Sequence, residues 1–130
     1  MPRHSAGPIG TMPDGSINPL SLAVRAGDFV FVSGLMAKDE SGLIVAGDIT
    51  AQTDVVMARL ARVLGEAGCT MADVVKCTVW LTDPDDFIAF NAAYQRHFSA
   101  PFPARATVRA DLLLPGARIE LEAVCYAPVP

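Results

Sequence analysis

The segment Phe102-Pro103-Ala104-Arg105-Ala106-Thr107-Val108 places one arginine between two alanines in apolar surroundings. Proline fixes its own φ and biases the residue before it toward extended backbone, so a strand is predicted after Pro103, with Arg105 and Thr107 on one face. The small Ala104 and Ala106 leave room beside Arg105 for a planar anion, because a guanidinium matches the two oxygens of a carboxylate or phosphate. An ion pair with one of the protein's own carboxylates explains the same residues equally well.

A second alternating segment, Arg118 to Tyr126, follows a turn at residues 112–116. Its apolar residues are expected to face inward, and Glu120 and Glu122 to face the other way. If this strand pairs with the arginine strand, Glu120 or Glu122 lies across from Arg105 or Thr107. Such a pair is either a cross-strand ion pair or an anion anchor beside a general base.

The composition indicates a single domain with a large apolar content. The chain has 130 residues, of which 52% are hydrophobic, and a net charge of −4; its mean hydropathy is +0.36 and its pI about 4.9. No apolar run reaches the roughly 20 residues of a membrane span, so the surplus apolar surface is expected to contact other subunits. The net negative charge argues against nucleic acid as a partner, because binding to its phosphates depends on positively charged surface.

The cysteines and histidines predict neither disulfides nor a metal site. Cys69, Cys77 and Cys125 are odd in number and lack a CxxC spacing, and no signal peptide precedes them. They are therefore interpreted as reduced thiols of a cytoplasmic protein. His4 and His97 lie far apart and form no metal-ligand pattern.

The remaining pattern divides the chain into a loosely structured lead-in, residues 1–18, and one folded domain, residues 19–130. The residues 29–32 read Phe-Val-Phe-Val and predict a strand buried on both faces. Asp48 is predicted to cap a helix that runs to about Gly65, and an aspartate and a proline at residues 83 and 84 to begin a second one. Further strands are expected at residues 22–24, 43–45 and 74–82, the last with Val75 facing inward and with Trp80 on a face directed at solvent or at another subunit.

Two further positions are candidate site residues. Gly34 follows Ser33 at the end of a strand, where a missing side chain allows a neighbour or ligand to approach, although an ordinary turn also explains it. Asn91 lies among the aromatic residues of the second helix, and a buried amide must find hydrogen-bond partners. Either a nearby loop or a ligand would supply them.

Several short motifs in this order resemble the reactive intermediate deaminase (RidA/YjgF) family. The motifs span residues 19–126, and the elements expected there follow the order β-β-α-β-α-β-β. The matching pieces are Phe29-Val30-Phe31-Val32-Ser33-Gly34, Gln52-Thr53, Val74-Val75-Lys76, Leu81-Thr82-Asp83, Phe90-Asn91, Pro103-Ala104-Arg105 and Ile119-Glu120-Leu121-Glu122-Ala123.

The resemblance implies a chorismate-mutase-like α+β fold, with two helices packed on one face of a mixed sheet. It also implies a homotrimer with clefts between subunits, which hydrolyses 2-imino or 2-enamino acids to 2-keto acids and ammonia without a cofactor or metal. By position, Arg105 would hold the substrate carboxylate and Glu120 would activate the attacking water, with Glu122 as the fallback base. The cleft would be lined by Leu20, Ser33, Gly34, Asn91, Ala106 and Thr107.

Three positions differ from the common family pattern, which often has tyrosine, glutamine and cysteine where this chain has Leu20, Leu35 and Thr107. The more apolar cleft that results is consistent with a different substrate side chain. It is also consistent with the alternative function, a non-catalytic trimeric module that binds small carboxylate metabolites.

Overall fold

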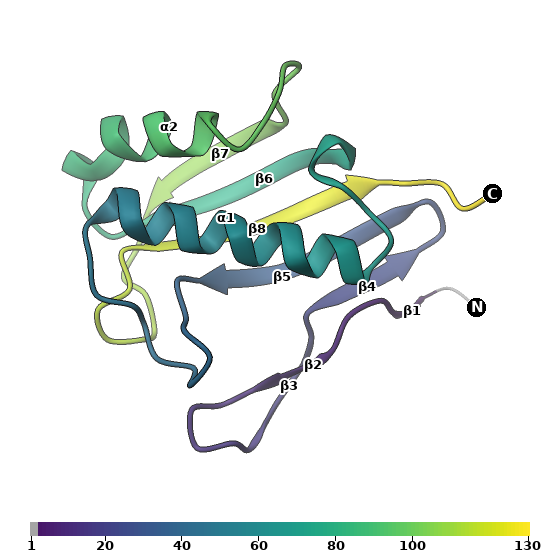
Figure 1. Ribbon diagram of the computed structural model, residues 1–130, viewed down its shortest axis with the longest axis horizontal. Coiled ribbons are helices and arrows are strands. Elements are labelled where there is room, and N and C mark those ends of the chain that lie inside the picture. Colours follow the sequence, from purple (N-terminus) through teal and green to yellow (C-terminus); the bar gives the residue numbers. More distant parts are fainter. Residues whose placement is uncertain (1–2) are drawn as a thin grey trace.

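The computed structural model describes residues 3–130, in which two helices lie against one face of a sheet (Figure 1). Met1 and Pro2, part of the predicted lead-in, lie outside the described residues. The elements are β1 (His4–Ser5), β2 (Ile9–Thr11), β3 (Ile17–Ser21), β4 (Ala23–Ala26), β5 (Phe29–Met36), α1 (Ile49–Glu66), β6 (Val74–Leu81), α2 (Phe87–Gln95), β7 (Ala104–Arg109) and β8 (Ile119–Tyr126), with short 3₁₀ turns at Met71–Asp73 and Pro84–Asp86.

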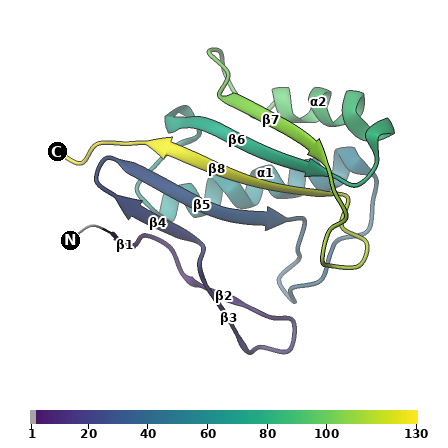
Figure 2. The same ribbon diagram turned by 180° about the vertical axis from the view of Figure 1, so that it is seen from behind.

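The main sheet has six strands in the order β1-β4-β5-β8-β6-β7. All its neighbours are antiparallel except β6 and β7, which are parallel and joined by α2. Figure 2 shows the sheet from the side that the helices leave open. The predicted α+β architecture, a mixed sheet with two helices on one face, is therefore confirmed.

Helix α1 begins and ends where the sequence predicts. The Asp48 side chain accepts a hydrogen bond from the Ala51 amide at 2.9 Å, which caps the first turn. Gly68, two residues after the last helical residue, has a φ of +80°. This left-handed conformation prevents the helix from continuing. The helix buries one stripe of side chains against the sheet: Val56, Met57, Leu60, Val63 and Leu64.

Strand β5 is buried on one face only. Val30 and Val32 lie in the core, whereas Phe29 and Phe31 are 41% and 47% exposed. The prediction of burial on both faces is therefore wrong for the single chain, because both helices cover the same side of the sheet. Strand β6 differs from its prediction for a local reason: its register with β8 shifts between Val74 and Lys76, and Val75 is exposed.

The predicted loose lead-in also differs from the structure. Strand β1 pairs with β4, and β2 pairs with β3 in a separate two-stranded ribbon. The Leu22 amide donates to the Pro8 carbonyl at 2.8 Å. Proline and glycine in this segment obscure the strand pattern, but its backbone groups find partners in β4 and in the ribbon.

Candidate functional site

Arg105 lies at the edge of the sheet, on the face covered by α2. Its Nη2 donates to Asn91 Oδ1 at 2.7 Å. Its Cζ lies 4.8 Å from the ring centre of Tyr94 and 5.1 Å from that of Phe90, and Phe87 is at 5.9 Å. The aromatic faces and the amide fix the guanidinium without neutralising its charge, because none of these partners is anionic. The cationic fork therefore remains available for an anion.

The space beside Arg105 is a hollow of about 410 Å³. Asn91, Tyr94, Gln95, Phe102 and Pro103 line it together with the arginine. Thr107 lies on the same face of β7 and borders an adjoining hollow with Phe87. Ala106 points to the opposite face of the strand, so only Thr107 among these neighbours faces the same way as Arg105.

Glu120 lies on β8 and approaches Gly34 closely. A Cβ atom added to Gly34 would stand 2.7 Å from Glu120 Oε2 and 3.1 Å from Cδ. The pairing of β5 with β8 shifts register between Val32 and Leu35, at Ser33 and Gly34. A side chain at residue 34 would therefore displace the Glu120 carboxylate from its present position.

The environment of Glu120 favours its protonated form. Partial burial raises the pKa of this carboxyl above its ordinary value, and the nearby charge of Glu122 raises it further, while Lys38 opposes the shift. A carboxylate whose pKa is raised toward neutrality is a stronger proton acceptor once it has ionised. Glu120 is therefore a candidate general base.

Leu20, Gly34 and Glu120 line one cavity of about 670 Å³. The β2–β3 ribbon forms one wall, and the loop that follows β5 forms another. Ser33 is not among the lining residues, and its hydroxyl donates to the Ser21 carbonyl at 2.7 Å. This hydrogen bond connects β5 to the end of β3.

Arg105 and Glu120 lie on opposite faces of the sheet. Arg105 is the register partner of Cys77 on β6, and Cys77 faces the helices. Glu120 pairs with Trp80 and Met36 on the open face. The predicted pairing of β7 with β8 is therefore wrong: β5 and β6 occupy both edges of β8, and β7 lies beyond β6.

No ion pair joins Arg105 to Glu120 or Glu122 anywhere in residues 3–130. The cross-strand ion-pair interpretation is thus excluded within the chain. Two half-sites remain, one around Arg105 and one around Glu120.

Sequence reasoning missed Lys38 and Arg59, which line the cavity beside Glu120. Lys38 lies in a polar turn and Arg59 on the polar flank of α1, so neither residue carries a local signal of a site. A charged residue on a helix flank is usually solvated, and only the tertiary structure brings these two side chains to the carboxylate. It also missed that the aromatic residues of α2 contact Arg105.

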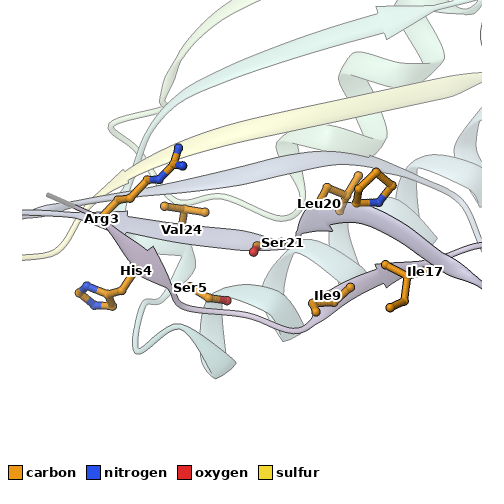
Figure 3. A pocket seen from close by; sticks show the side chains of 9 residues that line it. Arg3, His4, Ser5, Ile9, Ile17, Leu20, Ser21 and Val24 are labelled. Carbon is orange, nitrogen blue, oxygen red and sulfur yellow. The ribbon is translucent and has the colours of Figure 1, made fainter. Parts of the chain in front are cut away.

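A further hollow lies between β1, β4 and the β2–β3 ribbon (Figure 3). Ile9, Ile17 and Val24 supply apolar walls, with Arg3 and His4 at the β1 end. It contains neither Arg105 nor Glu120. Among residues 3–130 no cluster of histidine, cysteine or acidic side chains is arranged to hold a metal ion, and neither of the described helices is long and apolar enough to cross a membrane.

Comparison with known proteins identifies the family. The sequence profile described as Endoribonuclease L-PSP matches residues 12–127. A RutC family protein of Pyrococcus abyssi is 42% identical over 111 residues, covering 85% of this chain and 87% of that protein. The human 2-iminobutanoate/2-iminopropanoate deaminase is 38% identical over 111 residues, covering 85% and 81%.

Solved structures agree with these sequence matches. RidA from an Antarctic Psychrobacter species has a TM-score of 0.81 at 30% identity, covering 97% of this chain and 98% of that one. A Rid family protein of Yersinia pestis has a TM-score of 0.85 at 29% identity, covering 96% and 99%. The chain belongs to the RidA/YjgF family.

Proposed function

We propose that this protein hydrolyses reactive 2-imino and 2-enamino acids to 2-keto acids and ammonia. The observation that carries the proposal is the state of Arg105: its guanidinium is oriented by Asn91 and aromatic rings, yet no carboxylate among residues 3–130 pairs with it. A fork held in this way suits a substrate carboxylate. The relatives named 2-iminobutanoate/2-iminopropanoate deaminase support the reaction type.

In the proposed reaction Glu120 accepts a proton from water as the water oxygen bonds to the imine carbon. Glu120 returns this proton to the nitrogen, which gives a carbinolamine. Glu120 then takes the hydroxyl proton and passes it to the amino group as the carbon–nitrogen bond breaks, so that ammonia leaves and the carbonyl of the 2-keto acid forms. Arg105 cannot serve as the base, because arginine stays protonated at ordinary pH. A positioned base of this kind is worth about 10²–10⁴-fold in rate.

The separation of Arg105 and Glu120 supports a reaction that takes place between subunits. Arg105 of one subunit would meet Glu120 of a neighbour, because one chain holds them on opposite faces of its sheet. We therefore propose a homotrimer, the assembly that the family resemblance implies. Phe29, Phe31 and Tyr126 leave apolar surface exposed on the open face, which supports a subunit contact there.

Glu120→Gln tests the base directly. 2-Iminopropanoate is generated in situ from alanine by an amino acid oxidase, and its loss is followed with and without the protein. The wild type is expected to exceed the spontaneous rate, and Glu120→Gln to lose at least about tenfold in kcat with unchanged binding of the keto acid. Equal rates would exclude Glu120, whereas no acceleration by either protein would favour the alternative, a carboxylate-binding module whose cleft is made apolar by Leu20.

The carboxylate anchor is tested by two variants of Arg105. Arg105→Ala is expected to abolish binding of 2-oxobutanoate, measured by calorimetry, while circular dichroism remains that of the wild type. Arg105→Lys should also bind poorly, because an ammonium lacks the two parallel donors. Arg62→Gln, which removes an exposed cation from α1, is the matched control. A folded and fully active Arg105→Ala would contradict the assignment.

A further inference from the structure

The cavity that contains Glu120 extends to two cationic side chains that the proposed reaction does not use. Lys38 lies in the loop after β5 and Arg59 on α1, and both line the same cavity of about 670 Å³ as Gly34 and Glu120. Figures 1 and 2 show the β2–β3 ribbon and this loop at the same end of the molecule. One cavity thus holds a candidate base and a pair of cations.

Neither cation is neutralised within the described chain. The Lys38 ammonium has no hydrogen bond or ion pair to any residue of 3–130, although the side chain is half-buried. Arg59 Nη1 donates to the Met36 carbonyl at 2.6 Å, which fixes the guanidinium but leaves its charge. Burial and the charge of Arg59 lower the pKa of Lys38. Two partly buried cations in proximity are unfavourable unless an anion joins them.

The acidic residues that line this cavity do not pair with Lys38 or Arg59. Asp39 Oδ1 accepts hydrogen bonds from the Ser41 amide, the Ser41 hydroxyl and the Leu43 amide, so this carboxylate stabilises its own turn. Glu40 is exposed. Glu120 acts on the pKa of Lys38 but lies beyond ion-pair distance.

We propose that Lys38 and Arg59 bind a second carboxylate, at the side-chain end of the substrate. The preferred substrates are then 2-imino acids with acidic side chains, such as those formed by oxidation of glutamate or aspartate. This inference rests on the proposed function: the first carboxylate is held by Arg105 of a neighbouring subunit, and the imine carbon lies at Glu120. The side chain then extends along the cavity toward the two cations, whose donors suit carboxylate oxygens.

The test compares two imines that differ in the side-chain carboxylate. 2-Iminoglutarate and 2-iminobutanoate are generated in situ by amino acid oxidases, and kcat/KM is measured for wild type, Lys38→Met and Lys38→Arg. The wild type should prefer 2-iminoglutarate by about tenfold or more, as expected for hydrogen bonds to a charged group. Lys38→Met should abolish that preference, and Lys38→Arg should retain it.

The ratio of the two substrates is the informative quantity. Lys38 lowers the pKa of Glu120, so its removal affects both reactions through the base, whereas only the dicarboxylate loses a contact. Arg62→Gln, with the same change in charge outside the cavity, should leave the ratio unchanged. Equal hydrolysis of both imines by the wild type, or an unchanged ratio in Lys38→Met, would overturn the inference and leave the deaminase proposal intact.

Binding of the keto acids separates the two proposals if no hydrolysis occurs. Calorimetry with 2-oxoglutarate and 2-oxobutanoate needs no turnover. Preferential binding of 2-oxoglutarate that is lost in Lys38→Met would support the second carboxylate site although the protein is not a deaminase. Equal affinity for the two keto acids would overturn the site.

Discussion

Glu120 shows how the folded environment changes the chemistry of an ordinary carboxyl group. Burial raises its pKa, Glu122 raises it further and Lys38 lowers it. Because only the ionised carboxylate accepts a proton from water, kcat/KM should fall as the pH drops through this raised pKa. The acid limb of the pH profile is therefore expected above the ordinary pKa of a glutamate.

Glu122→Gln should move that acid limb to lower pH. The substitution removes a neighbouring negative charge, which lowers the pKa of Glu120 and keeps the base ionised in more acidic solution. Rates of imine hydrolysis between about pH 4 and pH 8 measure the shift. Glu66→Gln, at the end of α1 and on the helix side of the sheet, is the control and should leave the limb in place. An unmoved limb in Glu122→Gln, or complete loss of activity, would contradict the assignment of Glu120.

At the scale of the element, α1 is anchored by a buried amide. Gln52 is 2% exposed. Its Nε2 donates to the Gly116 carbonyl at 2.9 Å, and its Oε1 accepts from the Arg118 amide at 2.8 Å. These bonds attach the first turn of α1 to the residues that lead into β8. They help to fix the start of the strand that carries Glu120.

Gln52→Leu should destabilise the protein by about 1–3 kcal/mol, because it removes two hydrogen bonds that a buried amide makes to backbone groups. Urea unfolding monitored by circular dichroism measures the change. Gln95→Leu makes the same substitution at an exposed position of α2 and should cost less than about 0.5 kcal/mol. Similar midpoints for the two variants would show that the Gln52 bonds contribute little.

The elements from β4 onward could largely be predicted from the sequence, whereas β1, β2 and β3 were missed. The strand expected at residues 43–45 is wrong, because only an isolated bridge joins Lys38 and Ile44 there. The aspartate cap and the apolar stripe of α1 are local signals, and so is the alternation that puts Glu120 and Glu122 opposite Leu121. Strand neighbours are not local, and the expected pairing of the Arg105 strand with the Glu120 strand is wrong. The crossover through α2 instead puts β7 beside β6. The bulge at Gly34 and the contact of Asn91 with Arg105 likewise depend on tertiary packing.

At the scale of the whole molecule, several large apolar residues that the core does not bury lie on the open face of the sheet. Phe29, Phe31 and Tyr126 form exposed aromatic surface on the open face of the sheet, and Trp80 lies on that face beside Glu120. Aromatic residues in such a position are typical of subunit interfaces. The composition predicted a subunit contact but not that Arg105 and Glu120 lie on opposite faces, which follows from the register of β7 on β6 and of β6 on β8.

A mixture of two inactive variants tests whether the site forms between subunits. Arg105→Ala and Glu120→Gln are unfolded together in equal amounts and refolded, so that subunits assemble at random. If each site takes Arg105 from one chain and Glu120 from another, each residue is intact with a chance of one half. About a quarter of the sites should then be active. If both residues of a site came from the same chain, every site would carry one defect.

The rate of imine hydrolysis by the refolded mixture, compared with refolded wild type, gives the fraction of active sites. Each variant refolded alone is the control for residual activity, and sedimentation equilibrium confirms that the mixture assembles as the wild type does. A mixture no more active than the average of the two variants would contradict a shared site. Activity near one quarter would require Arg105 and Glu120 to act from different chains, because a site built from one chain would always carry one of the two substitutions.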